Sequence, residues 1–600
     1  MAEYPTLAAP YSSRKLITTF RGYHRNPKIG DGEFYHMENL TGDLYPLLSV
    51  RKPRGTLRQL TAPRALRGKS KLAWVDGTSL FYGEQDLTSY FTDAGFFLSD
   101  REDMLPKQLV SMGAYLIVYP DKLYINTENY TDCGSIESRF STDEGTPVTF
   151  TPCTAEGIAY SEPHIGTAAP ESPENGSLWL DTAALPHVLK QYSAQSALWA
   201  EIPTVYVRIG AAGIGRQFQV YDGVTVGGVA AHETGAYRQL QEINGSKVIY
   251  AKDDDYIVVV GVPGVGYVQT EGQVTVSRTM PDLDFITEAS NRLWGCRYGM
   301  AEGKTVNEIY CCALGDFKNW NRFLGISTDS YVASVGSDGP WTGAVTHLGC
   351  PVFFKEHCLH KVYISGEGAH QIVETACRGV AAGSHNSLSV VGETLLYHSP
   401  TGICAYDGSL PVPVSDVLGD VRYQNAVGGS LGDKYYVSMC DETQNWHLFV
   451  YDRRRGLFHR EDSTRALAFA NCGGELYYID GDTNLLMCVT GSQGALETDI
   501  FWQADTGVMG YTTTEQKYIG RFNLRIKLEP ASRAEVLVEY DSDGQWHSAG
   551  TMESKTLTSF MLPVRLRRCD HFRIRLQGHG GMKLYSFSKL FEKGSDEIYR

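Results

Sequence analysis

The stretch that decides the fold is NRLWGCRYGMAEGKTVNEIYCCALGDFKNWNRF, residues 291–323. It contains two short runs rich in aromatic and β-branched residues, Arg292–Arg297 and Glu308–Leu314, separated by a polar connection of about ten residues. An apolar run, a turn and a second apolar run predict a long antiparallel β-hairpin. Because similar units recur after Phe323, we expect a protein built from many small antiparallel sheets.

Hairpin units of this kind follow one another at spacings of roughly 35 to 50 residues, within the range of β-propeller blades. Two units come early, around Asp76–Gly77 and Asp121–Lys122, where hydrophobic alternation flanks a turn pair. The later units are 247–262, 291–323, 351–364, 387–408, 433–462 and 466–488. Since one small twisted sheet cannot bury both of its faces alone, we expect radial stacking into a β-propeller of about six to eight blades.

Changes in texture predict the domain organisation of this all-β chain. Residues 142–175 are rich in Thr, Pro, Glu, Ser and Gly, and the hairpin pattern resumes at 247, which predicts a small inserted β module. Beyond 494 the alternation has period two and predicts a C-terminal antiparallel β-sandwich-like domain. The expected order is an extended basic arm at 1–70, first propeller blades at 71–144, the inserted module at 145–240, the remaining blades at 241–494 and the C-terminal domain at 495–600.

The composition excludes several classes of protein. Among 600 residues, 42% are hydrophobic, and 36 Tyr with 62 Gly favour sheets with tight turns over helical bundles. A net charge of −15 argues against a general nucleic-acid binder, but suits a wall that lets DNA pass without sticking. The 13 Cys are odd in number and have no CxxC spacing, which predicts reduced thiols and assembly in a cytoplasm. We find neither a signal peptide nor an apolar run long enough for a membrane segment.

One segment, residues 51–71, is strongly basic in an otherwise acidic chain. It contains no acid and eight cationic residues: Arg51, Lys52, Arg54, Arg58, Arg64, Arg67, Lys69 and Lys71. The segment is interpreted either as a solvated arm or as an arm that docks on an acidic neighbouring subunit or a nucleic-acid surface. In the inserted module, Trp179 and Trp199 flank a polar stretch and are candidate surface-contact aromatics.

The search for catalytic, cofactor or metal residues gives none, so no enzyme is predicted. The string GGSLG at 428–432 matches the nucleophile-elbow pattern, but a strand follows it, so Ser430 is interpreted as a turn residue. His357, Cys358 and His360 are soft metal ligands by type. In a strand, however, 357 and 360 point to opposite faces, which favours packing. Three aspartates, 253–255, are interpreted as a polar turn.

The string SVGSDGPWTG, residues 334–343, is similar to the Asp-box of sialidases and related propellers. An Asp-box is a turn in which Asp and Ser side chains bond local backbone N–H groups and the Trp packs beneath, so it supports a fold and not a chemistry. Together with Trp179 and Trp199 it motivates the alternative of a carbohydrate-binding or glycoside-hydrolase propeller that contacts a host surface.

Six strings in order carry a family resemblance: NRLWGC, NEIYCCALGDFKNW, STDSYVASVGSDG, PVFFKEHCLHKVY, LLYHSPTGICAYDG and HLFVYDRRRGLFHRED. They resemble the propeller-forming virion proteins of tailed bacteriophages, similar to the tail-nozzle and packaged-DNA stabilisation proteins of short-tailed phages, over residues 240–490. The resemblance implies a structural tail protein without cofactor, assembled in the host cytoplasm and located in the virion. It also implies a sixfold homo-oligomeric ring at or below the head-to-tail connector. Such a ring would contact other tail and connector proteins, and genomic DNA would pass along it without sequence-specific binding.

Overall fold

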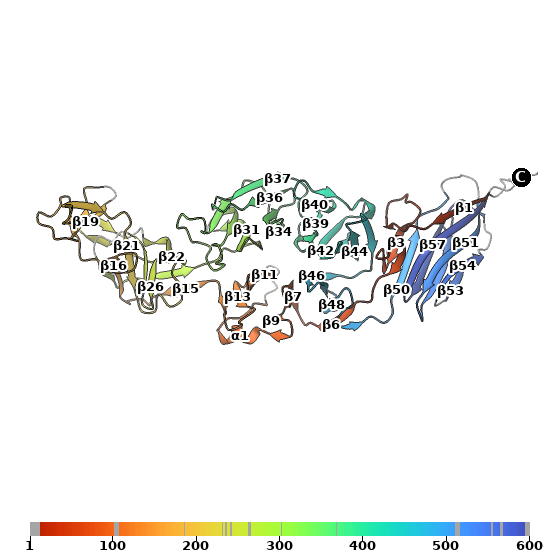
Figure 1. Ribbon diagram of the computed structural model, residues 1–600, viewed down its shortest axis with the longest axis horizontal. Coiled ribbons are helices and arrows are strands. Elements are labelled where there is room, and N and C mark those ends of the chain that lie inside the picture. Colours follow the sequence, from red (N-terminus) through yellow and green to blue (C-terminus); the bar gives the residue numbers. More distant parts are fainter. Residues whose placement is uncertain are drawn as a thin grey trace, which may run out of the picture.

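The computed structural model describes residues 12–593 except 101–106, 185–186, 231, 235–236, 240–242, 262–265, 302, 368, 511–516, 554–555 and 564–567. The described chain is almost entirely β, with one short helix, α1 (Thr88–Asp93), and two 3-10 turns, η2 (His385–Ser387) and η3 (Asp416–Leu418). Figure 1 shows an elongated molecule in three parts: a ring of small sheets in the middle, an inserted module at one end and a sandwich at the other. The described residues contain no helix with the length and hydrophobicity needed to cross a bilayer.

The ring consists of seven small antiparallel sheets, numbered here as ring sheets 1 to 7. Ring sheets 1 to 3 are β7–β10 (Pro63–Gly68, Leu72–Asp76, Ser79–Tyr82, Gln85–Asp86), β11–β14 (Gln108–Met112, Tyr115–Tyr119, Leu123–Asn126, Cys133–Ser135) and β30–β33 (Phe285–Ala289, Arg292–Ala301, Lys304–Cys311, Tyr331–Ser334). Ring sheets 4 to 6 are β34–β37 (Gly343–His347, Cys350–Phe354, Cys358–Tyr363, Gln371–Ala376), β38–β41 (Ser389–Val391, Thr394–Ser399, Gly402–Tyr406, Val412–Pro413) and β42–β45 (Tyr423–Leu431, Lys434–Asp441, Trp446–Asp452, Leu457–Arg460).

Ring sheet 7 is built from both ends of the chain. It contains β46 (Ala466–Cys472), β47 (Glu475–Asp480) and β48 (Leu485–Cys488), followed by β6 (Gly55–Gln59) and β49 (Ala495–Leu496). The first strands of ring sheets 1 to 4 contact one another in order, and η2 contacts ring sheets 4, 5 and 6. The first strands of ring sheets 5, 6 and 7 also contact one another in order, and β46 contacts β7. The ring is therefore closed, and the arrangement is β-propeller-like.

The stretch 291–323 forms the second and third strands of ring sheet 3, β31 and β32. Ser290 and Asn291 both have positive φ, 52° and 57°, as a tight two-residue turn between strands requires. The predicted hairpin is present, but its strands are longer than expected, because pairing continues to Ala301 and Lys304. The expected connection of about ten residues is wrong, because its polar residues belong to strands that extend beyond the core, where Met300 is 68% exposed.

The inserted module leaves the ring after β14 and returns before β30, and it spans 138–278 instead of the expected 145–240. Its strands are β15 (Ser138–Ser141), β16 (Val148–Cys153), β17 (His164–Gly166), β18 (Leu178–Asp181), β19 (Val188–Ser193), β20 (Leu198–Glu201), β21 (Tyr206–Gly210), β22 (Gly223–Gly227), β23 (His232–Thr234), β24 (Tyr237–Gln239), β25 (Gly245–Val248), β26 (Ala251–Asp253), β27 (Tyr256–Val260), β28 (Tyr267–Gln269) and β29 (Thr275–Arg278). Residues 247–261 of the expected ring unit 247–262 belong to the module, because β27 pairs with β21, and residue 262 lies outside the described residues. The module has its own buried core, which includes Phe150, Val207 and Phe218.

The sandwich combines strands from the two ends of the chain. One sheet contains β1 (Ser12–Ile17), β4 (Leu40–Thr41), β5 (Leu48–Val50), β51 (Lys517–Leu528), β54 (Leu557–Pro563), β55 (Arg568–Cys569) and β57 (Met582–Lys593). The other contains β2 (Gly22–Tyr23), β3 (Glu33–Glu38), β50 (Phe501–Thr506), β52 (Arg533–Tyr540), β53 (His547–Met552) and β56 (Phe572–His579). The expected C-terminal domain is therefore present but needs residues 12–50 to complete its sheets.

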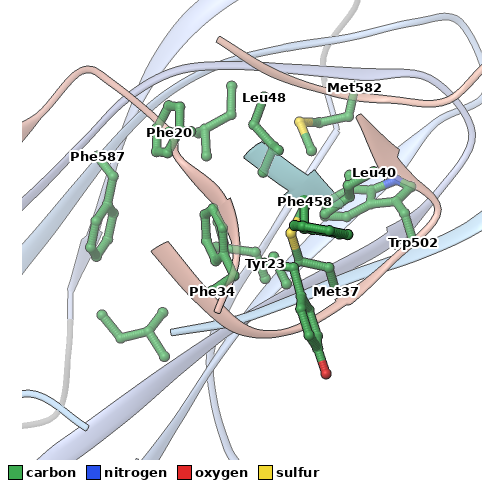
Figure 2. Close-up of a cluster of buried hydrophobic side chains, with 14 of the residues drawn as sticks. Phe20, Tyr23, Phe34, Met37, Leu40, Leu48, Phe458, Trp502, Met582 and Phe587 are labelled. Carbon is green, nitrogen blue, oxygen red and sulfur yellow. The ribbon is translucent and has the colours of Figure 1, made fainter. Parts of the chain in front are cut away.

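The core of the sandwich continues into the ring. Figure 2 shows Phe34, Met37 and Trp502 close to Phe458, which lies in β45 of ring sheet 6. All four side chains are buried in one continuous cluster. Burial of such large apolar side chains is the main favourable term in packing, so the sandwich and the ring are joined by a hydrophobic interface.

Candidate functional site

A cavity with a volume of about 800 Å³ lies at the centre of the ring. Its lining comes from the first strands of the ring sheets and from η2, as expected for the axis of a radially stacked fold. The polar and charged lining residues are Arg64, Arg67, Ser99, Asp100, Lys107, Gln108, Thr287, Glu288, Thr346, His385 and Asn386. A cavity of this size and polarity is large enough for a small polar ligand.

Two of the three cations in the cavity are neutralised by acids. Arg64 Nη2 lies 2.8 Å from Asp100 Oδ1, and Lys107 is paired with the buried Asp121. Arg67 has no ion pair or hydrogen bond within the described part of the chain. Burial lowers the pKa of Arg67, and the nearby Glu288 partly offsets this effect. Arg67 is therefore the cation best placed to meet an anionic group in the cavity.

The basic segment 51–71 is not an arm in this structure, because its residues belong to ring sheets 7 and 1 and to their junction with the sandwich. Arg51 Nη1 lies 2.6 Å from Glu497 Oε2, and Arg54 Nη2 lies 2.6 Å from Glu461 Oε2. The acidic neighbour of these two arginines is thus the far end of the same chain. Residues 1–11 of the expected arm lie outside the described residues.

The other cations of the segment are distributed over the ring. The Arg58 guanidinium lies 4.8 Å from the Phe81 ring centroid, and Lys71 lies 5.7 Å from that of Tyr82. Lys69 Nζ donates to the carbonyl of Ala114 at 2.7 Å. Lys52 is exposed at the surface. The eight cations do not form one surface, because successive strand residues face opposite sides of a sheet.

The two predicted surface aromatics pack against each other in the module. Trp179 is 8% exposed, and its Nε1 donates to the carbonyl of Gly166 at 2.9 Å. The Trp199 ring meets the Trp179 ring edge to face, with centroids 5.6 Å apart. Trp179 is therefore a core residue and not a surface contact, while Trp199 is partly exposed.

One group of three metal-ligating side chains occurs among the described residues: Cys358, His360 and Glu374, in ring sheet 4. Cys358 and His360 lie on one face of β36, and Glu374 is the β37 residue directly opposite His360. His357 is exposed and takes no part in the group. Sequence analysis missed Glu374, since its position depends on strand register and not on spacing within one motif.

Comparisons with known proteins identify no family for this chain. No protein-family model matches the sequence, and no curated protein matches it. Among solved structures, the chain is similar to an acylaminoacyl peptidase of Pyrococcus horikoshii, with 11% identity, a TM-score of 0.23 and coverage of 49% of this chain and 47% of the peptidase. The match thus spans about half of the peptidase.

Two glycoside hydrolases are also similar. One is an engineered GH43 enzyme with endo-xylanase and exo-arabinofuranosidase activity, at 9% identity and a TM-score of 0.20, covering 52% of this chain and 97% of that enzyme. The other is the exo-β-1,3-galactanase of Phanerochaete chrysosporium, at 8% identity and a TM-score of 0.20, covering 51% of this chain and 94% of the galactanase. At these TM-scores the similarity assigns no activity to this protein.

Proposed function

We propose that this protein is a structural, ring-forming component of a bacteriophage tail, of the nozzle or hub type, that lines or extends the DNA exit channel below the connector. The observation that carries the proposal is the three-part elongated architecture, in which the module and the sandwich project from opposite sides of the ring (Figure 1). Such a subunit offers separate surfaces for neighbouring copies and for the proteins above and below it. The sequence strings similar to those of phage tail proteins lie in the ring.

We further propose that the seven ring sheets act as the blades of a closed propeller, and that six copies of the chain form the tail ring. A closed propeller is a rigid support for assembly, because each of its sheets packs against a neighbouring sheet on both sides. The net charge of −15 supports a conduit role, since an acidic wall does not retain DNA phosphates. Assembly would take place in the host cytoplasm, and the mature location would be the virion tail.

The test is the oligomeric state of the purified protein and its presence in particles. Light scattering after size-exclusion chromatography, at rising protein concentration and with purified connector protein, should show a defined ring, and electron microscopy should show its symmetry. Mass spectrometry of purified virions from the source of the gene should detect the chain. A protein that stays monomeric with connector present and is absent from virions would exclude the proposal.

A second candidate is a carbohydrate-binding or glycoside-hydrolase propeller that contacts the host surface. The observation in its favour is the polar central cavity, in which the Arg67 guanidinium can meet the carboxylate of an acidic saccharide. Binding to a glycan array that is lost in Arg67→Gln and retained in Lys52→Gln would support this function. An array and a glycosidase panel without signal would remove it.

A further inference from the structure

Cys358, His360 and Glu374 converge on the face of ring sheet 4 that packs against ring sheet 3. The residue opposite His360 on β35, Phe353, lies in the buried cluster shared by these two sheets, which places the group on that face. Cys358 and His360 are 7% and 1% exposed. The Glu374 side chain is 50% exposed, so solvent reaches the group from the outer edge of the ring.

The distances within the group are close to those of a metal site. His360 Nε2 lies 3.4 Å from Glu374 Oε2, and the three ligand atoms all lie within 4.8 Å of one another. In a tetrahedral zinc site, bonds of about 2.0–2.1 Å to nitrogen and oxygen place two such ligand atoms roughly 3.3–3.4 Å apart. The separation of the His360 and Glu374 ligand atoms matches this distance. A small rotation of the Cys358 side chain brings its sulfur within bonding distance of the same ion.

We propose that Cys358, His360 and Glu374 bind one divalent transition-metal ion, with Zn²⁺ as the ion that fits this mixed sulfur, nitrogen and oxygen set best. The fourth position faces the solvent beside Glu374 and is open to water. The ion would connect β36 to the outermost strand β37, because two ligands come from one strand and the third from the other.

The surroundings of the group contain further polar atoms that orient it. Ser337, in the connection between ring sheets 3 and 4, has its Oγ 3.2 Å from His360 Nε2. Lys355 Nζ donates to the Ser337 carbonyl at 2.7 Å and lies 4.5 Å from the Trp341 ring centroid. The ammonium is thus held by other partners, and its charge favours the thiolate form of Cys358.

Metal binding must release one proton from the site. Burial raises the pKa of the Cys358 thiol, and the Glu374 carboxylate raises it further, so the free site holds a protonated thiol at neutral pH. Burial lowers the pKa of His360, which favours the neutral imidazole that a metal ion binds. Forming the sulfur–metal bond therefore transfers the thiol proton to the solvent, and metal affinity should fall as the pH is lowered.

The experiment titrates Zn²⁺ and Co²⁺ into the full-length chain after treatment with a chelator and its removal. We expect one ion per chain, a thiolate-to-cobalt charge-transfer absorption and the visible absorption of tetrahedral cobalt. Calorimetry in buffers of different ionisation enthalpy should show about one proton released per ion. Cys358→Ser should abolish the charge-transfer absorption, and Glu374→Gln should weaken binding by about tenfold or more.

Two matched controls distinguish this site from other thiols and carboxylates, because the chain contains 13 cysteines. Cys377 directly follows β37, and Glu367 is an exposed carboxylate in the connection between β36 and β37. Cys377→Ser and Glu367→Gln should both leave metal binding unchanged. Because Glu374 lies at the surface, Glu374→Gln should fold. It keeps the test valid if Cys358→Ser does not fold. Failure to saturate at one ion per chain, or binding retained in both site variants, would overturn the proposal.

Discussion

Arg54 and Glu461 form a buried ion pair between residues 407 positions apart in the sequence, with Nη2 and Oε2 2.6 Å from each other. The same guanidinium has its Nη1 2.8 Å from Asp462 Oδ2. Arg54 is 3% exposed and directly precedes β6, the strand that completes ring sheet 7. The pair thus fixes the position at which the beginning of the chain joins the end of the ring.

Replacing Arg54 by methionine should therefore strongly destabilise the protein. It removes the direct partner of the buried Glu461 and leaves only Arg51, whose Nε lies 3.9 Å from Glu461 Oε2. Removal of one partner from a buried pair costs about 3–5 kcal/mol of unfolding free energy. Chemical denaturation followed by fluorescence measures the loss. Arg64→Met is the control, because its pair with Asp100 is about a third exposed and should contribute less than about 1 kcal/mol. Equal losses in both variants would contradict the assignment.

Closure of ring sheet 7 should be sensitive to a single methyl group at Gly55. A Cβ at this position would lie 1.8 Å from the Gln493 carbonyl oxygen, so Gly55→Ala forces the backbone of β6 or its neighbour to move. Overpacking of this kind costs typically about 1–3 kcal/mol, and we expect a lower thermal midpoint and faster proteolysis near residue 55. Gly336→Ala, where the added Cβ meets no atom within 4 Å, should leave both measurements unchanged.

Stability should fall as the pH is lowered from 7 to 5. Burial lowers the pKa of His398 to about 4 and that of His459 to about 3. In the unfolded chain, histidine has a pKa of about 6.5, so below this pH the unfolded state binds more protons than the folded state. The contribution of these neutral histidines to stability is therefore complete above pH 6.5. It is lost as the pH falls from 6.5 towards their folded-state pKa values.

The loss at pH 5 should amount to about 1–2 kcal/mol for each of these histidines. His398→Gln removes one titrating group and should flatten the dependence, whereas replacement of the exposed His357 by Gln should not. Denaturation midpoints at closely spaced pH values are the measurement. A profile that is flat between pH 7 and 5 would show that these two side chains do not titrate as their burial requires.

The module should be removable without loss of the ring. Its first and last strands, β15 and β29, are paired neighbours, with Ser138 opposite Arg278, so a short Gly/Ser linker can replace 138–278. The shortened chain should still unfold cooperatively, and the excised module should fold alone, because its core consists only of its own residues. Circular dichroism and thermal melts of both fragments test this. Aggregation of the shortened chain would instead mean that the ring depends on its contacts with the module, such as the hydrogen bond from Asn319 to Asp222.

Local features of the fold could be predicted from the sequence. The all-β class is confirmed, and the hairpin at Asp76–Gly77 is present with Gly77 at φ 59°. These features depend on alternation and turn chemistry, which act over a few residues. The boundary of the module could not be predicted, because apolar and polar residues alternate in β25, β26 and β27 in the same way as in the ring strands.

Long-range features could not be predicted, because pairing partners far apart leave no local pattern. The strand β6 is part of a segment that stands out only for its charge, although it pairs with β48. Trp179 lies beside a polar stretch of sequence, as a surface aromatic would, but it is buried within the module. The group of Cys358, His360 and Glu374 could not be predicted for the same reason, because strand pairing and not sequence spacing places Glu374 opposite His360.

Because the sandwich sheets and ring sheet 7 both combine the first described strands with the last ones, the order of synthesis has a cost for this chain. On the ribosome, β1–β6 emerge long before β46–β57 exist, so they lack their partners β48, β50 and β57 while the intervening ring sheets and the module fold. Domains that fold in the order of synthesis normally avoid such a delay. Emergence of β57, and not growth of the first half, therefore sets the moment at which the native molecule can form.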